Sequence, residues 1–263
     1  MRDTLSTTDY GLIGHPLGHS FSKAFFTELF AADGSGRSYD NFDLPALTPE
    51  ALYALVLLNP ALKGLNVTAP YKEEIISYLD TVDGAAAEVE AVNTVKIDRD
   101  STGRVTALHG FNTDVVGFSR SIEPLVKGLP AGSGALVLGT GGAAKAVVYA
   151  LRSLGLVPRT VSRTAGKGDL TYADLTPELV AANPVVVNAT PCGTWPNTET
   201  CPPFPYEYLS EQHIAHDLVY NPEETEFMRR AAACGATVKN GLDMLLEQAR
   251  AALDIWQNNQ NII

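Results

Sequence analysis

Short apolar runs alternate with amphipathic stretches along the first part of the chain, and this alternation predicts its secondary structure. The runs "YGLIG" from Tyr10, "YDNFDL" from Tyr39 and "LKGLNVT" from Leu62 are bounded by glycine, proline or polar residues, as strands usually are. Helical spacing follows in "SKAFFTELFA", "PEALYALVLL" and "YKEEIISYLD", the last of which begins just after Pro70. Strands that alternate with helices favour a largely parallel sheet.

Two further β-branched runs, "AVNTVKI" and "VTALHGFNT", predict strands with a turn at 98–103 between them. From Ala135 the pattern becomes more regular: the strand "ALVLG", a glycine cluster, the helix "AAKAVVYALRSLG" and the strand "RTVSRT" form a βαβ unit. The runs "PVVVNAT" and "HIAHDLVY" predict further strands, "EETEFMRRAAACG" predicts a helix, and the proline-rich segment 191–205 predicts an irregular loop.

The last predicted helix, 242–256, carries an apolar stripe at spacings of three and four residues. The stripe comprises Leu245, Gln248, Ala249, Ala252 and Trp256. Gln248 is therefore turned inward, either as a satisfied polar residue of the core or as a ligand contact.

A length of 263 residues fits two domains of modest size, and two domains usually enclose a cleft. The 19% charged and 45% hydrophobic residues are typical of a soluble enzyme. A net charge of −11 argues against a nucleic-acid groove or an anionic membrane surface as partner. No apolar run approaches the roughly 18 residues of a membrane span, and the first residues lack the apolar region of a signal peptide. We therefore expect a cytoplasmic protein.

Cysteine usage points the same way. Cys192, Cys201 and Cys234 are odd in number and lack CxxC spacing, which favours free thiols in a reducing compartment. Together with His213 and His216 they could suggest zinc, but only two residues separate the histidines, where zinc motifs usually have three to five. No metal is expected.

The glycine cluster predicts a phosphate site. "LGTGGAAKA" fits G-x-G-x-x-A at Gly139, Gly141 and Ala144, follows an apolar strand and opens a helix. Glycines let the backbone approach a pyrophosphate, and a helix N-terminus presents unpaired N–H groups to it. The alternative is a glycine-rich turn without a ligand.

The end of the next strand indicates which dinucleotide binds. An NAD site has Asp or Glu there for the ribose 2′-hydroxyl. Here Ser162, Arg163 and Thr164 stand instead, with Lys167 close behind, and these side chains match a 2′-phosphate better. The predicted cofactor is NADP.

Hydride transfer requires a proton donor at the reacting oxygen. Lys72 follows Pro70, with Asn66 and Thr68 at the end of the preceding strand, and Asp114 ends the segment "GFNTD". A lysine beside a carboxylate can hold its charge and pass a proton, although from these residues alone a structural salt bridge explains the pair equally well.

Seven ordered motifs, spread over nearly the whole chain, resemble those of the shikimate dehydrogenase family. They are "GLIGHPLGHSFS", "NVTAPYK", "AVNT", "GFNTD", "GTGGAAKA", "NATPCG" and the stretch from "DLVYNPEETEF" to "NGLDMLLEQA". The resemblance implies NADPH-dependent, reversible reduction of 3-dehydroshikimate to shikimate, on the route to chorismate and the aromatic amino acids.

The resemblance also implies residue roles. Lys72 and Asp114 match the catalytic pair. The matches to substrate contacts are Ser20, Ser22, Thr68, Asn93, Tyr220 and Gln248. The matches to cofactor contacts are Gly139, Thr140, Gly141, Gly142 and Ala143 around the diphosphate, Ser162, Arg163, Thr164 and Lys167 around the 2′-phosphate, Thr190, Leu218 and Gly241 near the nicotinamide, and Asp83. For the two serines, helix N-capping is the alternative, and Ser22 could serve both roles.

The chain departs from the family pattern at two places. The family usually continues the serine motif as S-P-x-x-H-N, whereas Lys23 follows Ser22 here and no Asn lies on that turn. The 2′-phosphate segment commonly begins with Asn and here begins with Ser162, which removes an amide donor.

The implied fold is α/β: a substrate domain of residues 1–113 and 241–263, and a Rossmann-type parallel-sheet NADP domain of residues 114–240, with the C-terminal helices returning to the first domain. The cleft between them is expected to hold the small-molecule substrate. Alternatives are a dual-specificity quinate/shikimate dehydrogenase, a methylene-tetrahydrofolate dehydrogenase, which the motifs fit poorly, and a non-catalytic NADP-binding paralogue. The expected assembly is a monomer or homodimer, with no nucleic-acid or membrane partner.

Overall fold

The computed structural model describes residues 8–18 and 21–258. The chain divides into two compact units: unit 1 is Met1–Thr113 with Ala249–Ile263, and unit 2 is Asp114–Gln248. Both boundaries fall inside helices, α4 (Thr113–Val126) and α8 (Leu242–Trp256). The second boundary therefore lies within the last helix, whereas the sequence suggested a boundary before it.

Unit 1 contains a six-stranded sheet with strand order β2-β1-β3-β5-β6-β4. The strands are β1 (Tyr10–Gly14), β2 (Tyr39–Asp43), β3 (Gly64–Val67), β4 (Thr81–Val82), β5 (Thr94–Arg99) and β6 (Val105–Phe111). β1 runs parallel to β2 and β3, whereas β5 runs antiparallel to both β3 and β6. The sheet is mixed rather than largely parallel because β5 and β6 form a hairpin.

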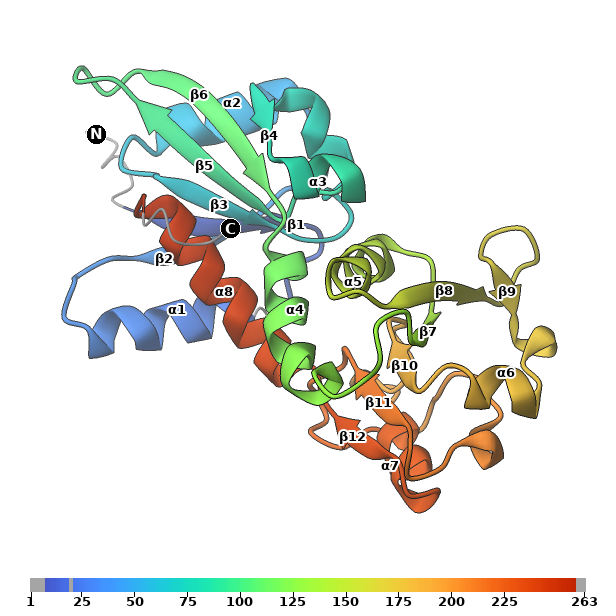
Figure 1. Cartoon of the computed structure of the whole chain (residues 1–263). Helices are drawn as coiled ribbons and strands as arrows, with labels where there is room; N and C mark the ends of the chain where they lie inside the picture. The colour runs from blue at the N-terminus through green and yellow to red at the C-terminus, as the bar shows by residue number, and fades with distance from the viewer. Residues whose placement is uncertain (1–7, 19–20, 259–263) are drawn as a thin grey trace. The chain divides into compact units, whose positions relative to one another are not determined.

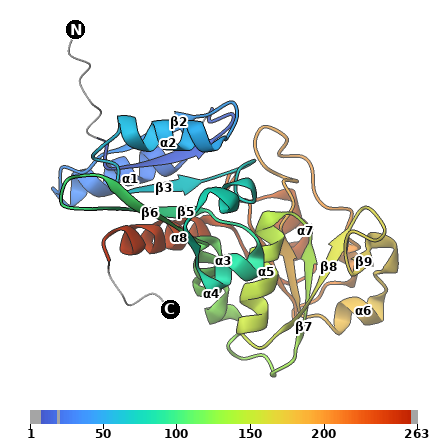
Figure 2. The same ribbon diagram turned by 90° about the horizontal axis from the view of Figure 1, so that it is seen from above.

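Helices cover both faces of this sheet (Figures 1 and 2). On one face α2 (Pro49–Leu58) buries Leu52 and Val56 in a core that includes Leu65 of β3. On the other face α1 (Phe21–Ala32) and the last turns of α8 enclose an aromatic cluster. The cluster comprises Tyr10, Leu12, Phe26, Phe30, Tyr39, Ala249, Ala252 and Trp256.

The segment "YKEEIISYLD", predicted as an α-helix, instead contains a turn and a 3-10 helix. Lys72 lies in a turn, and a short 3-10 helix, η1 (Glu74–Tyr78), follows it. The N–H of Leu79 bonds the carbonyl of Ile76, three residues back, as a 3-10 turn requires. Adjacent β-branched Ile75 and Ile76 lower the helical propensity of so short a segment. The helix α3 (Gly84–Val89), which the sequence pattern did not predict, follows β4.

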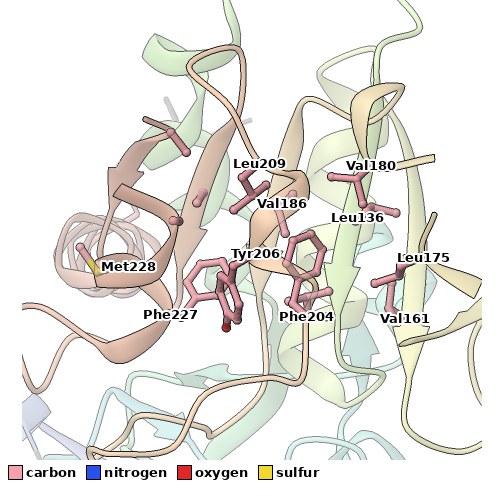
Figure 3. Close-up of a cluster of buried hydrophobic side chains, with 14 of the residues drawn as sticks. Leu136, Val161, Leu175, Val180, Val186, Phe204, Tyr206, Leu209, Phe227 and Met228 are labelled. Carbon is pink, nitrogen blue, oxygen red and sulfur yellow. The ribbon is translucent and has the colours of Figure 1, made fainter. Parts of the chain in front are cut away.

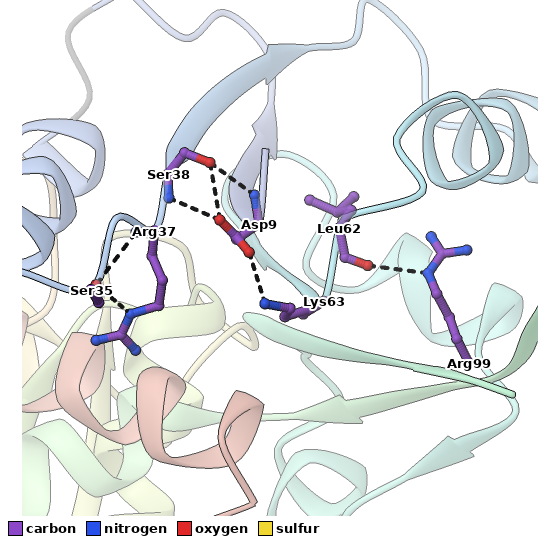
Figure 4. A network of polar contacts seen from close by, with 7 residues as sticks. All are labelled: Asp9, Ser35, Arg37, Ser38, Leu62, Lys63 and Arg99. Atoms are coloured by element: carbon purple, nitrogen blue, oxygen red, sulfur yellow. Dashed lines mark hydrogen bonds and ion pairs between the residues drawn. The ribbon is translucent and has the colours of Figure 1, made fainter. Parts of the chain in front are cut away.

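Polar side chains brace the amino ends of the three parallel strands (Figure 4). Asp9, just before β1, accepts a hydrogen bond from Lys63 Nζ at 2.8 Å and two from the backbone N–H and hydroxyl of Ser38 at 3.1 and 3.2 Å. Lys63 precedes β3 and Ser38 precedes β2. In the same view the guanidinium of Arg99 donates to the carbonyl of Leu62. The end of the sheet opposite its carboxyl edge is thereby tied together.

Trp256 fixes the end of α8 on the unit 1 sheet. Its ring stacks on Tyr10 with centroids 4.6 Å apart, and Nε1 donates to the carbonyl of Val95 at 3.0 Å. The indole lies directly over Gly64, where an added Cβ would overlap it. Only glycine leaves room for this contact.

Unit 2 contains a six-stranded, fully parallel sheet with order β12-β11-β10-β7-β8-β9. The strands are β7 (Gly134–Leu138), β8 (Val157–Ser162), β9 (Leu170–Thr171), β10 (Val185–Asn188), β11 (Ile214–Asp217) and β12 (Thr237–Lys239). Counted from β7, this is the 3-2-1-4-5-6 order of Rossmann folds. The order reverses between β7 and β10, which is where such folds bind dinucleotides.

The central strands of unit 2 are buried on both sides, as continuous apolar runs in a parallel sheet should be. One face carries α5 (Gly142–Ser153) and α4, and the other carries α6 (Pro177–Ala181), α7 (Glu226–Ala233) and the 3-10 helices η2 (Tyr172–Asp174) and η3 (Tyr206–Tyr208). The second face forms the core in Figure 3, where Phe204, Tyr206 and Phe227 pack beside Leu136 and Val186.

Replacing Gly64 with alanine should destabilise the protein, because the new methyl group would displace the indole of Trp256 and its hydrogen bond to Val95. We expect the free energy of unfolding to fall by about 2–3 kcal/mol, measured by chemical denaturation. Gly84→Ala is the matched control, since no atom lies within 4 Å of a Cβ at that helical position. Equal effects of the two substitutions would contradict the packing argument.

Candidate active site

Unit 1 gathers polar side chains at one edge of its sheet, where β3 and β6 end and the antiparallel β5 begins. Thr68 follows β3, and its N–H donates to the carbonyl of Ile13 at 2.9 Å. Lys72 lies four residues further on, and its carbonyl accepts the N–H of Val92 at 2.7 Å, which brings the lysine turn beside Asn93. Predicted substrate residues Thr68 and Asn93 and the predicted catalytic Lys72 thus belong to one edge of one sheet.

The amide of Asn93 is oriented by its neighbours. Its Oδ1 accepts from the backbone N–H of Thr113 at 2.7 Å, from the hydroxyl of Thr113 at 3.1 Å and from that of Thr94 at 3.1 Å. All three residues are buried. With the oxygen held from behind, Asn93 presents its NH₂ group as a donor.

The serine motif lies at the start of α1. Ser20 lies outside the described residues. Ser22 is the second residue of α1, so N-capping, the alternative to its predicted role in substrate binding, does not apply to it: the helix begins one residue earlier, at Phe21. Burial raises the pKa of Tyr39 well above its usual range, and the Ser22 hydroxyl is its hydrogen-bond partner. Lys23, which departs from the family pattern, forms an ion pair with Asp40 at 2.7 Å.

Two predicted acidic residues occupy helix starts. Asp83 N-caps α3, with its carboxylate accepting from the N–H of Ala85 at 3.1 Å. It belongs to unit 1, whereas the other predicted cofactor residues belong to unit 2. Asp114 lies in the first turn of α4, directly after Thr113 in the chain.

The glycine turn of unit 2 connects β7 with α5. Gly139 has a φ of +120°, and a Cβ there would lie 3.0 Å from the carbonyl oxygen of Ala189. Gly141 is the N-cap of α5, and glycine has no side chain to occupy the helix N-terminus. No atom lies within 4 Å of a Cβ at Gly141 or Gly142, so the space in front of the turn is open. This is the arrangement a diphosphate requires. The predicted contacts Thr140, in this turn, and Ala143, the second residue of α5, are partly exposed.

A buried polar network holds the loops next to that turn. The Thr190 hydroxyl donates to Asn188 Oδ1 at 2.6 Å, and Asn188 Nδ2 donates to Asp217 Oδ1 at 2.9 Å. The other carboxylate oxygen accepts the hydroxyl of Thr225, the N-cap of α7, at 2.6 Å. The carboxyl ends of β10 and β11 and the start of α7 are thus one hydrogen-bonded assembly.

Leu218 and Gly241 lie at the same edge of the unit 2 sheet. The N–H of Leu218 donates to the carbonyl of Asn188 at 3.0 Å, and an added Cβ at Gly241 would overlap the carbonyl of Leu218. The structure therefore brings Gly139, Thr190, Leu218 and Gly241 together at one edge of the unit 2 sheet.

The predicted 2′-phosphate residues follow β8. Ser162 is buried, and its hydroxyl accepts the N–H of Thr164 at 3.1 Å, which shapes the turn. Arg163, Thr164 and Lys167 are exposed. Two cations and a hydroxyl are therefore accessible to an anion at the position where Rossmann folds bind the adenosine ribose.

Tyr220 and Gln248, the two remaining predicted substrate contacts, both belong to unit 2. Tyr220 is 37% exposed in the loop after β11. Gln248 is partly buried and donates from Nε2 to the carbonyl of Leu245 at 3.0 Å. Its backbone and Cβ pack against Gly117 of α4, where an added Cβ would lie 2.9 Å away.

Residue patterns did not single out Asn188, Asp217, Thr94 or Thr113 as supports of the site. A signal exists for the first two: each is the polar residue that ends a buried apolar strand, "VVVN" and "IAHD". Such a residue at a carboxyl edge must be bonded to something.

Burial shifts the pKa values of two consecutive residues of β11 in opposite directions. It lowers the pKa of His216 to about 3 and raises the pKa of Asp217 to about 6. His216 Nε2 lies 3.0 Å from the hydroxyl of Ser121, and its ring packs on Phe118. Successive strand residues face opposite sides of the sheet, so the two groups titrate in separate surroundings.

Some general features of the described residues complete the picture. All three cysteines are free. Across residues 8–18 and 21–258, no cluster of His, Cys, Asp and Glu side chains is suited to hold a metal ion, and no helix has the length and apolar character needed to cross a membrane.

The strand order and the glycine turn of unit 2 define a dinucleotide-binding protein of the Rossmann class, joined to a second α/β unit. Residues 12–95 match the model of the shikimate dehydrogenase substrate binding domain. The NADP(+)-dependent shikimate dehydrogenase of Moorella thermoacetica is 40% identical over 275 residues, which cover 97% of this chain and 90% of that protein. The chain belongs to the shikimate dehydrogenase family.

Solved structures agree. Shikimate 5-dehydrogenase from Thermus thermophilus, in complex with NADP(H) and shikimate, matches with a TM-score of 0.81 and 34% identity, covering 95% of this chain and 94% of that one. Quinate dehydrogenase from Corynebacterium glutamicum, in complex with NAD, matches with a TM-score of 0.83 and 29% identity over 95% and 94% of the two chains.

The opposite pKa shifts of His216 and Asp217 predict a compensated pH dependence. The folded state holds the Asp217 proton more tightly than the unfolded chain does, so this group adds stability as the pH falls from about 6 to about 4. His216 resists protonation when folded, so its contribution is lost as the pH falls below about 6.5.

Substituting either residue should reveal the effect of the other on the pH dependence of stability. The quantity to compare is the change in the free energy of unfolding per pH unit between about pH 4 and 6. As the pH falls, Asp217→Asn should lose about 1.4 kcal/mol more per pH unit than the unmodified protein. His216→Gln should change the slope by a similar amount in the opposite direction. Denaturation curves at several pH values measure both slopes. Parallel profiles for the three proteins would contradict the assignment.

Proposed function

We propose that this protein catalyses the reversible, NADPH-dependent reduction of 3-dehydroshikimate to shikimate. The observation that carries the proposal is the 40% identity to an NADP(+)-dependent shikimate dehydrogenase over 97% of the chain. The polar groups at the carboxyl edge of unit 1 and the open glycine turn of unit 2 support it, since the reaction needs a polyhydroxy-acid site and a dinucleotide site.

The two units take different parts of the work in this proposal. Unit 1 binds the substrate, in agreement with the match of residues 12–95 to a substrate binding domain. The Asn93 amide donates to a substrate oxygen, with Ser20, Ser22 and Thr68 as further proposed contacts. Tyr220 and Gln248, which belong to unit 2, are retained as proposed substrate contacts. Unit 2 holds the cofactor, which supplies hydride when bound.

Lys72 and Asp114 are the proposed acid–base residues. In the direction of reduction the Lys72 ammonium donates a proton to the oxygen of the carbonyl that receives hydride, and in the reverse direction the amine accepts the proton of the hydroxyl. Asp114 orients the ammonium and stabilises its charge. Support comes from Asn93: the lysine turn bonds its neighbour Val92, and the residue before Asp114 bonds its amide oxygen.

The cofactor is proposed to lie along Gly139–Ala143, with its 2′-phosphate at Arg163, Thr164 and Lys167 and its nicotinamide near Thr190, Leu218 and Gly241. The open space at the glycine turn and the exposed cations fit such a molecule. Asp83 is retained as a further cofactor residue, although its carboxylate already caps a helix.

A quinate dehydrogenase activity is the second candidate, because the NAD-bound quinate dehydrogenase has an equally close fold. Arg163 argues against NAD, since it stands where NAD sites carry an acid. We further propose a cytoplasmic location and a monomeric or homodimeric assembly that acts on small molecules alone.

The purified protein should reduce NADP with shikimate, seen as nicotinamide absorbance, and should do so far more slowly with NAD or with quinate.

Lys72→Ala should lower kcat by at least roughly 10²-fold and leave NADPH affinity unchanged, because one acid–base group is lost. Lys63→Ala is the matched control: this lysine is paired with Asp9 at the opposite end of the sheet, and kcat should not change. Full turnover by Lys72→Ala would exclude the lysine from the chemistry.

Arg163→Ala should raise KM for NADP by roughly 10- to 100-fold and leave KM for NAD unchanged, because a charge-assisted hydrogen bond to phosphate is lost. Arg159→Ala, at a partly buried position within β8, should alter neither value. An equal loss with both cofactors would show that Arg163 does not bind the 2′-phosphate.

A further inference from the structure

Tyr39 is buried in an aromatic cluster, where packing of its ring does not require the hydroxyl. It is 4% exposed on β2, and its ring stacks on Phe26 with centroids 4.6 Å apart. A phenylalanine would fill the same space without the cost of burying a polar group. The hydroxyl is nevertheless bonded: it donates to Asn66 Oδ1 at 2.8 Å.

Asn66 can face Tyr39 in only one way. Its Nδ2 donates to the carbonyl of Asn93 at 3.4 Å and to the hydroxyl of Thr94 at 3.3 Å, so its oxygen must point back toward Tyr39. Asn66 is 6% exposed, and turning its amide over would place its oxygen against the carbonyl oxygen of Asn93, where neither group can donate.

The chain of donors continues to the proposed substrate contact. Thr94 accepts from Asn66 and donates from its hydroxyl to Asn93 Oδ1 at 3.1 Å. Tyr39, Asn66, Thr94 and Asn93 therefore form a one-way series in which each residue donates to the next. Its last free donor is the NH₂ group of Asn93. Aligned hydrogen bonds of this kind polarise and fix one another when they are buried.

We propose that Tyr39 is a positioning residue, whose hydroxyl, together with the N–H of Thr113, holds this series in the direction in which Asn93 offers its NH₂ group to a substrate oxygen. The inference rests on the proposed function in so far as Asn93 binds substrate. Tyr39 itself contacts neither substrate nor cofactor in this account and acts through Asn66 and Thr94. Its hydroxyl also bonds Ser22, another proposed substrate contact, so the amide resonances of Asn93 decide which route operates.

Tyr39→Phe tests the proposal, because it keeps the ring stack and removes only the hydroxyl. KM for shikimate should rise roughly 3- to 10-fold, as expected for the loss of one buried hydrogen bond, whereas kcat and KM for NADP should stay within twofold. Thr94→Val should produce a similar rise, and the two changes combined should raise KM by less than the product of the single effects.

Tyr10→Phe is the matched control. Tyr10 pairs with Tyr39 in register on the adjacent strand, is equally buried and stacks on Trp256, but its hydroxyl bonds Arg37 and not the amide series. Tyr10→Phe should leave KM for shikimate unchanged. A rise of equal size in both variants would reduce the role of Tyr39 to packing and overturn the proposal.

A second measurement separates this proposal from the proposed function. Side-chain amide resonances of Asn66 and Asn93, assigned by Asn66→Asp and Asn93→Asp, should shift in Tyr39→Phe and not in Tyr10→Phe, without any ligand. Unmoved Asn93 resonances in Tyr39→Phe overturn the positioning role whatever the kinetics. If the unmodified protein does not oxidise shikimate, the proposed function fails, and the amide shifts still decide the role of Tyr39.

Discussion

A polar side chain buried at the end of a strand needs hydrogen-bond partners, and this requirement shapes both units of the protein. In unit 1 it fixes the amide of Asn93 through Thr94 and Thr113. In unit 2 it joins Thr190, Asn188 and Asp217. In unit 2 parallel strands direct their carboxyl ends to one edge, where such sheets bind ligands, and in unit 1 the network lies where β3 ends and the antiparallel β5 begins. Stability and ligand recognition therefore depend on the same hydrogen bonds.

Much of the fold could be predicted from the sequence because local patterns and packing agree. The helix at 49–58 and the last helix at 242–256 appear where their spacing indicates, and the glycine turn follows β7 as its motif requires. Agreement is closest where apolar periodicity is strong, as in α8, whose predicted stripe includes the buried Ala249, Ala252 and Trp256.

The features that the sequence did not reveal depend on tertiary contacts. Helix α4 contains Gly117 and Pro124, which lower helical propensity, yet Gly117 is what allows α8 to approach closely. Ser22 looked like an N-cap, but α1 begins one residue before it. Tyr39 belongs to no motif, and its importance lies in a bond to Asn66, which is 27 residues away. Spacing along a chain cannot report such a contact.

The brace formed by Asp9, Ser38 and Lys63 secures the amino ends of β1, β2 and β3, which is the edge remote from the proposed chemistry. A sheet anchored at one end can tolerate exchange of side chains at the other without unfolding. Because the two ends are separated in this way, substitutions at the ligand edge leave the hydrogen bonds that secure the scaffold intact.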